Sequence, residues 1–194
     1  MRLFKNYKKK SDEQLMQLVQ QGDSQAFSII YDRYAHRMKA FFYRMLWSDD
    51  AKAEDYVHDL FARIIERPEL YQSGYPLLPW LFRIASNMCK NAYRKRQFEV
   101  EYLQQIEKNK MQLSAVEQKM DEEILLDKLH QVLKKLGEDK QELFLLRYQQ
   151  QLSTKELASI YETSEGTIKS RLFYIRKTLL DVMGEDKIIW ENGK

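Results

Sequence analysis

Apolar residues recur at helical spacing along most of the chain. Within residues 57–65 they stand at offsets of 0, 3, 4, 7 and 8, which places them on one face of an α-helix. The same period predicts a helix over about 24–46, and Ser11 with Gln14 forms a capping-box pattern that predicts a shorter helix before it. Strand-type alternation is scarce, and the chain has only six Gly and three Pro. The pattern therefore predicts an all-α protein.

The segment RPELYQSGYPLLPW, residues 67–80, interrupts this pattern because it holds all three prolines. Proline lacks the amide donor and restricts the residue before it, so the segment cannot be helical throughout. We expect a fourth helix to begin near Pro79, since proline is tolerated in a first helical turn. Its predicted buried stripe comprises Trp80, Leu81, Ile84, Ala85, Met88 and Ala92.

The apolar pattern then weakens. From Phe98 to Glu123 the chain carries seven acids against three bases, which is typical of a solvated linker with some helical tendency. Helical periodicity returns afterwards, with helices predicted at about 122–136 and 139–149 and two shorter ones after them. The sequence therefore predicts two small helical domains joined by a flexible linker. They are an N-terminal helical bundle at 11–97, the linker at 98–121 and a C-terminal four-helix unit at 122–183.

The stretch STKELASIYETSEGTIKSRLFYIRKTLL predicts two helices separated by a tight corner. Ser153 and Glu156 form a capping box for the first helix, and Ser164 can cap the second. The corner YETS lacks glycine, so Glu162 or Thr163 must turn the chain unaided. The second helix has an apolar stripe of Ile168, Leu172, Ile175 and Leu179, which leaves Thr167, Lys169, Ser170 and Tyr174 outward. This pattern predicts a helix-turn-helix that enters the DNA major groove, and an ordinary helical hairpin is the alternative.

The net charge of +3 hides a strong segregation of charge. Residues 78–97 hold five bases and no acid, whereas residues 47–66 hold six acids against two bases. A second basic block lies on the last predicted helix and comprises Lys169, Arg171, Arg176 and Lys177. Two basic blocks divided by acidic ones indicate two separate faces for nucleic acid. The alternative is that each block is simply a solvated helix face.

Several classes of function are disfavoured. The single cysteine, Cys89, excludes an intrachain disulfide and does not support a cysteine-based metal site. The histidines, His36, His58 and His130, are scattered, so we expect neither an enzyme such as a nuclease, nor a metal, nor a cofactor. No apolar run approaches the roughly 18 residues of a membrane span, and the basic start lacks the apolar core of a signal peptide. We therefore expect a cytoplasmic protein without direct membrane insertion.

Three segments resemble parts of one known family, in the same order along the chain. LFLLRYQQQLSTKELASIYETSEGTIKSRLFYIRKTL resembles the C-terminal promoter-binding region of bacterial sigma factors of the extracytoplasmic-function (ECF) group, sigma-70 family. AKAEDYVHDLFARI resembles the core-polymerase-binding helix of that group, and LPWLFRIASNMCKNAYRKR resembles a DNA-reading helix. The resemblance implies that residues 11–97 form sigma region 2 and that residues 122–183 form sigma region 4.

The resemblance implies a role in transcription initiation. Proteins of this group bind core RNA polymerase, direct it to promoter DNA and help to separate the strands. The group is usually restrained by an anti-sigma factor, so such a partner is expected here. The alternative is a helix-turn-helix transcriptional regulator that forms no holoenzyme. That alternative would need neither an acidic polymerase-docking helix nor a second basic helix.

The resemblance also assigns roles to residues expected on the surface. Core-polymerase binding is implied for an acidic face that comprises Glu54, Asp55, Asp59 and Arg63. A local Asp59–Arg63 pair at i,i+4 is the alternative for part of that face. Reading of the downstream promoter element is implied for Arg83, Asn87, Lys90, Asn91, Arg94, Lys95 and Arg96. Binding of the upstream element is implied for Ser164, Thr167, Lys169, Ser170, Arg171, Phe173, Tyr174, Arg176 and Lys177.

Strand separation is implied for the fourth helix and the loop before it. Asn87 and Asn91 match family positions that read a base extruded from the non-template strand. The loop 69–78 matches the segment that shapes the pocket for that base. Tyr71 and Tyr75 could stack on the base, although loop tyrosines often serve only packing.

Two features depart from the family pattern. The group often has arginine at position 174, where this chain has Tyr174. The corner YETS also lacks the small or glycine residue that is often found there. These departures concern the upstream promoter sequence rather than the fold.

Overall fold

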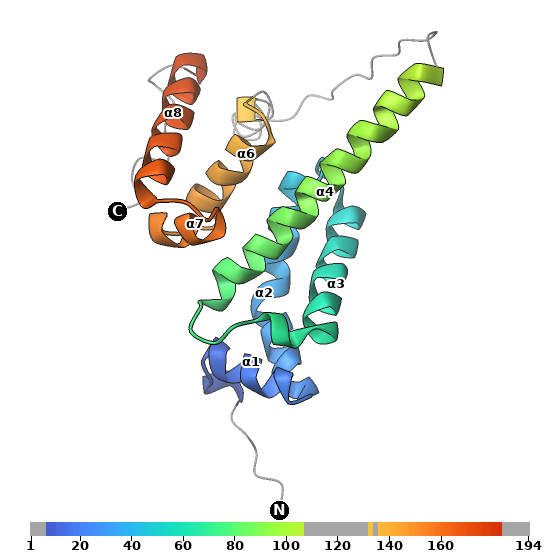
Figure 1. Cartoon of the computed structure of the whole chain (residues 1–194), viewed down its shortest axis with the longest axis vertical. Coiled ribbons are helices and arrows are strands. Elements are labelled where there is room, and N and C mark those ends of the chain that lie inside the picture. The colour runs from blue at the N-terminus through green and yellow to red at the C-terminus, as the bar shows by residue number, and fades with distance from the viewer. Residues whose placement is uncertain (1–6, 107–131, 134–135, 184–194) are drawn as a thin grey trace, which may run out of the picture. The chain divides into compact units, whose positions relative to one another are not determined.

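The computed structural model describes residues 7–106, 132–133 and 136–183 (Figure 1). Every regular element within these residues is helical, which confirms the all-α prediction. The chain divides into two compact units, residues 1–90 and 91–194, and each unit is described by itself. The domain bounds expected from the sequence stay a prediction.

The first unit contains three helices, the start of a fourth and two short 3-10 turns among its described residues. They are η1 (Tyr7–Lys9), α1 (Asp12–Gln20), α2 (Ser24–Met45), α3 (Asp50–Glu66), η2 (Pro68–Leu70) and α4 (Leu77–Ile106). The predicted capping box of Ser11 and Gln14 is present at the start of α1. α2 packs against both α1 and α3. Phe41 of α2 meets Phe82 of α4 edge to face, with ring centroids 5.3 Å apart, so α4 joins the same core.

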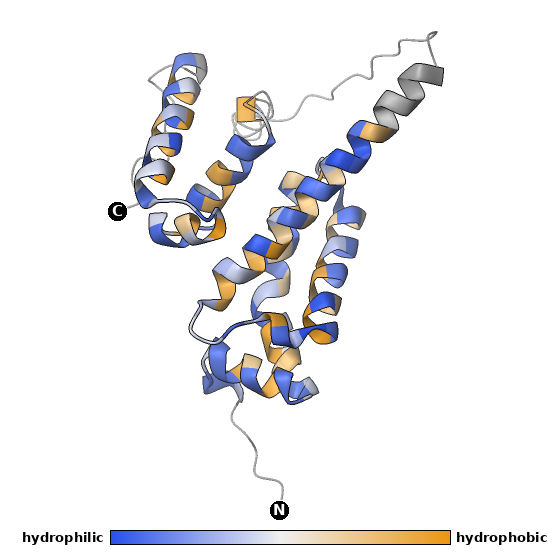
Figure 2. Ribbon diagram, in the orientation of Figure 1, coloured by the Kyte–Doolittle hydropathy of each residue, from blue (hydrophilic) through white to orange (hydrophobic). Residues whose placement is uncertain are grey.

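The buried face of α3 follows the predicted apolar stripe with one exception. The buried members are Val57, Leu60, Phe61 and Ile64. Ile65 is 55% exposed, so its predicted burial is wrong. Neighbouring residues of a helix point about 100° apart, and Ile65 therefore turns away from the core that Ile64 enters. Figure 2 shows the resulting division of the helices into hydrophobic and hydrophilic sides.

The fourth helix is longer than predicted. α4 begins at Leu77, places Pro79 in its first turn, and continues to Ile106. It therefore enters the segment that we expected to be a linker. Residues 98–106 contain neither Gly nor Pro, so no local signal ends the helix there. Residues 107–121 of the expected linker lie outside the described residues.

The second unit holds the predicted helix-turn-helix. Its described elements are α6 (Glu138–Phe144), a π-helical turn η3 (Leu145–Gln149), α7 (Thr154–Ile160) and α8 (Glu165–Met183). α8 packs against both α6 and α7. The helix predicted at 139–149 is present, but its second half is π-helical, and Gln150 N–H donates to Leu145 O at 3.0 Å. The helix predicted at 122–136 lies mostly outside the described residues.

Candidate polymerase- and DNA-binding surfaces

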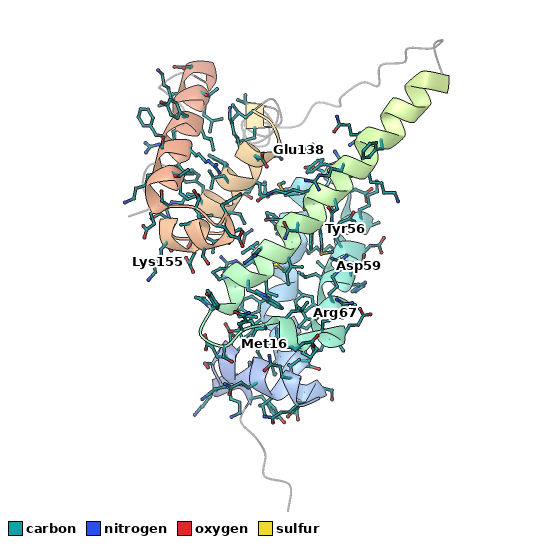
Figure 3. The ribbon with its side chains drawn as sticks, viewed as in Figure 1. Met16, Tyr56, Asp59, Arg67, Glu138 and Lys155 are labelled. Atoms are coloured by element: carbon teal, nitrogen blue, oxygen red, sulfur yellow. The ribbon has the colours of Figure 1, made fainter. Side chains whose placement is uncertain are left out.

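The acidic face of α3 points to solvent. Its predicted members are all exposed, namely Glu54, Asp55, Asp59 and Arg63. Glu54 contacts Lys39 Nζ at 2.7 Å and is therefore tied to α2. Within the described part of the chain no ion pair joins Asp59 to Arg63, so the local-pairing alternative is not found. Asp55 and Asp59 thus present carboxylates to solvent, and Figure 3 shows Asp59 on this helix.

The basic face of α4 is also outward, as predicted. Arg83, Asn87, Asn91 and Arg94 are exposed on this face and Lys90 is half-buried, while Lys95 and Arg96 are exposed further round the helix. Leu81, Ala85 and Met88 are buried on the other side of the same helix. Asn87 and Asn91 are one helical turn apart, so both amides can reach one site. Amide groups can both donate to and accept from base edges, which the neighbouring Lys and Arg side chains cannot.

The loop before α4 is fixed at its root and exposed at its tip. Tyr71 is only 2% exposed, packs edge to face on Trp80 at 5.3 Å, and donates its hydroxyl to Tyr75 O at 2.6 Å. Of the two roles left open for Tyr71, the structure shows the packing one, because its ring is already covered. Tyr75 is 56% exposed, and its stacking role stays a prediction.

The corner between α7 and α8 is built as the sequence required. Glu162 adopts φ +50°, in the left-handed region, and Thr163 N–H donates to Ala158 O at 3.0 Å. For a residue other than glycine, this backbone conformation costs roughly 1–2 kcal/mol of free energy. Neighbouring contacts must therefore stabilise the turn. The predicted capping box of Ser153 with Glu156 is present at the other end of α7, where that helix begins. Ser164 Oγ also accepts the Thr167 N–H at 3.1 Å and so begins α8.

The predicted stripe of α8 faces inward, and most of its predicted DNA-binding residues face solvent. The buried residues are Ile168, Leu172, Ile175 and Leu179. The exposed residues are Ser164, Lys169, Ser170, Arg171, Phe173, Tyr174 and Lys177. Thr167, expected to face outward, is half-buried, because its hydroxyl lies 2.9 Å from Ser164 Oγ in the cap. Arg176 is half-buried as well.

Two adjacent aromatic residues are exposed on the outer side of α8. Phe173 and Tyr174 are 63% and 62% exposed, and their ring centroids lie 5.6 Å apart in an edge-to-face contact. The basic residues Lys169 and Lys177 are exposed on the same helix. Apolar side chains in the major groove can contact the methyl group of thymine, while Lys and Arg side chains bind phosphates. The arrangement is therefore suited to duplex DNA.

A contact that the sequence did not reveal joins α6 to the corner. Tyr161 OH donates to Glu142 Oε1 at 2.7 Å, and the Glu142 residue is only 1% exposed. Burial and the nearby Glu142 carboxyl raise the pKa of Tyr161 well above its ordinary value, so the hydroxyl keeps its proton. The partners are 19 positions apart in the sequence, and Glu142 stands directly before the apolar run Leu143–Leu146, so no local pattern predicted the contact.

The described residues contain no group of three or more His, Cys, Asp or Glu side chains that could hold a metal ion. Among the described helices, none combines the length and the apolar character needed to cross a membrane.

Two family matches cover the parts of the chain that carry these surfaces. Residues 30–99 match the protein-family model of sigma-70 region 2, and residues 126–179 match that of sigma-70 region 4. The first match contains the acidic face of α3 and the basic face of α4, and the second contains the helix-turn-helix. The chain therefore belongs to the sigma-70 family.

Its relatives include members of the ECF group. The chain is 28% identical over 178 residues to the ECF RNA polymerase sigma-E factor of Escherichia coli strain K12, covering 87% of this chain and 92% of that protein. It is 25% identical over 178 residues to the RNA polymerase sigma-H factor of Pseudomonas aeruginosa PAO1, covering 87% and 91%. These alignments extend over both units.

Solved structures also resemble the chain. The sigma factor RpoE in complex with the anti-sigma factor NepR, from Bartonella quintana, aligns with a TM-score of 0.65 at 26% identity, covering 83% of this chain and 98% of that one. CnrH in complex with the cytosolic domain of CnrY aligns with a TM-score of 0.67 at 20% identity, covering 91% and 99%, and this second likeness concerns the fold alone.

Proposed function

We propose that this protein is a sigma factor that binds core RNA polymerase and directs promoter-specific transcription initiation, including separation of the DNA strands. The observation that carries the proposal is the presence of three distinct surfaces on one chain of the sigma-70 family. They are the acidic face of α3, the Asn-containing basic face of α4, and the basic, aromatic face of α8.

Core polymerase is the proposed partner of the acidic face on α3. Asp55 and Asp59 are exposed, and the ion pairs of the described structure leave both carboxylates available. A row of unpaired carboxylates on a rigid helix favours a basic partner surface and speeds its encounter. Arg63 lies near the end of the same face. Its charge is opposite to that of the carboxylates, so it would help to orient the partner on the helix.

The two other surfaces are proposed to divide the promoter between them. The face of α4 offers amide and basic side chains on a helix that follows an exposed loop, which suits an unpaired strand with a base turned out of the stack. The face of α8 belongs to a helix-turn-helix, which suits the major groove of intact duplex. The downstream element is therefore proposed for α4 and the upstream element for α8.

An anti-sigma factor is a further proposed partner. The similar structure from Bartonella quintana is a sigma factor bound to an anti-sigma factor, and that alignment spans 83% of this chain. We expect the protein to act in the cytoplasm, where promoter DNA and RNA polymerase are found. Sigma factors as a class act as initiation factors rather than as enzymes, and the absence of catalysis in this chain stays a prediction.

The main test combines binding with transcription. The full chain should co-elute with core RNA polymerase on size exclusion, and the mixture should transcribe DNA fragments that core polymerase alone does not. Promoters for this assay come from sequencing RNA 5′ ends after overexpression of the protein. A helix-turn-helix regulator without holoenzyme activity would elute apart from core polymerase and would not restore initiation, which would refute the proposal.

A further inference from the structure

The loop between η2 and α4 is exposed, yet it is held by several contacts at its root. Residues 72–76 all face solvent, whereas Tyr71 is buried. Gly74 has φ +98°, and Tyr75 N–H donates to Gln72 O at 3.4 Å, which closes a turn within the loop. An exposed turn gains little from burial, so its conformation depends on these polar contacts.

A side chain of α1 holds the start of the loop. Gln20 Nε2 lies 3.0 Å from Pro68 O and 3.0 Å from Tyr71 O. Both partners are carbonyl oxygens, so only the NH₂ group of Gln20, which has two N–H donors, can satisfy them together. The last residue of α1 thus joins both ends of the short turn η2 across about 50 positions of sequence.

The buried tyrosine holds the far side of the loop. Tyr71 OH donates to Tyr75 O at 2.6 Å, and its ring packs on Trp80 in the first turns of α4. Burial, with smaller effects from Glu13 and Asp12, raises the pKa of Tyr71 to about 12. The hydroxyl therefore remains a donor at any physiological pH.

We propose that Gln20 and Tyr71 are positioning residues that preset the 72–76 loop as one wall of the pocket for the extruded promoter base, and thereby set which base the pocket accepts. This inference rests on the proposed function. Neither side chain needs to touch the DNA. Gln20 acts through two backbone carbonyls, and Tyr71 acts through the carbonyl of the exposed Tyr75.

Base selection depends on such a wall because preference is a difference between two affinities. A wall that can shift accommodates the wrong base as well as the right one, so the difference shrinks. A preset loop also avoids the entropy cost of ordering during base capture. Loosening the loop should therefore reduce preference more than it reduces total binding.

The test compares full-length variants in holoenzyme assembled with core RNA polymerase. Gln20→Glu keeps the side chain's length but replaces the donor with a carboxylate facing two carbonyls. Gln21→Glu is the matched control, because it adds the same charge one residue away on an exposed side chain. Tyr71→Phe keeps the buried ring and removes the hydroxyl. The substrates are promoter fragments with a fixed upstream element and a randomised downstream element, and transcripts are counted by sequencing.

We expect Gln21→Glu to match the wild type. Tyr71→Phe should reduce the base preference at one downstream position by about three- to tenfold, the effect of losing one hydrogen bond. Gln20→Glu loses two hydrogen bonds and should reduce the preference at the same position by at least as much. Thermal melting of each variant shows whether it is folded. If Tyr71→Phe does not fold, the result for Gln20→Glu alone tests the proposal. An unchanged preference at every position, or an equal loss on all fragments, would overturn the proposal. If holoenzyme assembled with the wild-type protein transcribes no fragment, the result would instead refute the proposed function itself.

Discussion

The reading faces of α4 and α8 carry similar charge but differ in what stands beside them. The exposed face of α4 offers Asn87 and Asn91 on a helix that follows a loop whose root is tied down by side-chain hydrogen bonds. The exposed face of α8 offers Phe173 and Tyr174 after a tight corner without a loop of this kind. Positive charge attracts any nucleic acid, so the neighbouring structure must distinguish an unpaired base from a duplex groove.

The two regions also differ in how they hold their helices. In the first unit, the aromatic contact of Phe41 with Phe82 fixes α4 in a core shared by several helices. In the second unit, α8 follows a strained corner at Glu162, and the Tyr161–Glu142 hydrogen bond supports that corner from α6. Both helices bury an apolar face, so the difference lies in the segment before each helix. Two side chains, Gln20 and Tyr71, hold the loop before α4, whereas one buried hydrogen bond supports the strained corner before α8.

The largest effect is expected for the surface that has no counterpart on the second unit. Reversing Asp55 and Asp59 to Lys should abolish co-elution with core polymerase, because a basic partner would then meet like charge. Helical content by circular dichroism should stay native, since both side chains are exposed. The double reversal of Asp32 and Glu69 is the control, with the same change in charge at other exposed positions. Unchanged co-elution of the Asp55/Asp59 variant would sink the docking assignment.

The next effect separates strand opening from duplex binding. Replacing Asn87 and Asn91 by Ala should leave polymerase binding and closed complexes largely intact, because the acidic face and α8 are untouched. Separation of the promoter strands should be impaired, because each well-formed contact to a base that is lost removes about 1–3 kcal/mol of binding free energy. The measurement is 2-aminopurine fluorescence in the downstream element at equal occupancy.

Gln97→Ala, an exposed amide further along α4, is the control for that experiment. Wild-type opening kinetics and amplitude in the double Asn variant would show that these asparagines are ordinary surface residues. The two helices would then not differ in the kind of DNA that they bind.

A smaller effect is expected on the duplex side. If Lys169 holds a phosphate, Lys169→Ala should weaken all promoters alike and reduce the salt slope by about one unit. If Lys169 reads a base, the loss should depend on sequence, at about 1–3 kcal/mol for the matched base. Affinity is measured by fluorescence anisotropy on upstream-element duplexes, with Lys140→Ala on α6 as the control. Affinity equal to wild type on every duplex would mean that α8 does not enter the groove.

The smallest effect concerns the support of the corner. Tyr161→Phe should lower the free energy of unfolding by about 1 kcal/mol, because Glu142 loses one hydrogen-bond donor while the ring still packs. Chemical denaturation of the full chain, followed by circular dichroism, measures the change. Tyr174→Phe on α8 is the control, since that side chain is exposed. Equal stability of Tyr161→Phe and the wild type would show that the buried contact does not support the corner.

Features that depend on near neighbours along the chain could be predicted from the pattern of residues. Apolar spacing located the buried stripes of α3 and α8, and side-chain caps located helix starts such as Ser153 and Ser164. The missing glycine at the corner correctly required a strained residue, which is Glu162. These signals are readable because a helix face and a cap each involve residues within one or two turns of each other.

Features whose partners are far apart along the chain could be seen only in the folded protein, because packing of the helices brings those partners together. This packing buried Tyr71 beside Trp80 instead of leaving it for stacking, and it placed Gln20 on the carbonyls that begin the loop. It also brought Tyr161 to Glu142. The residues next to a tyrosine or glutamine in the sequence are the same whether its side chain faces solvent or makes a hydrogen bond to a distant group. Its role is therefore set only when packing of the helices decides which distant polar group it meets.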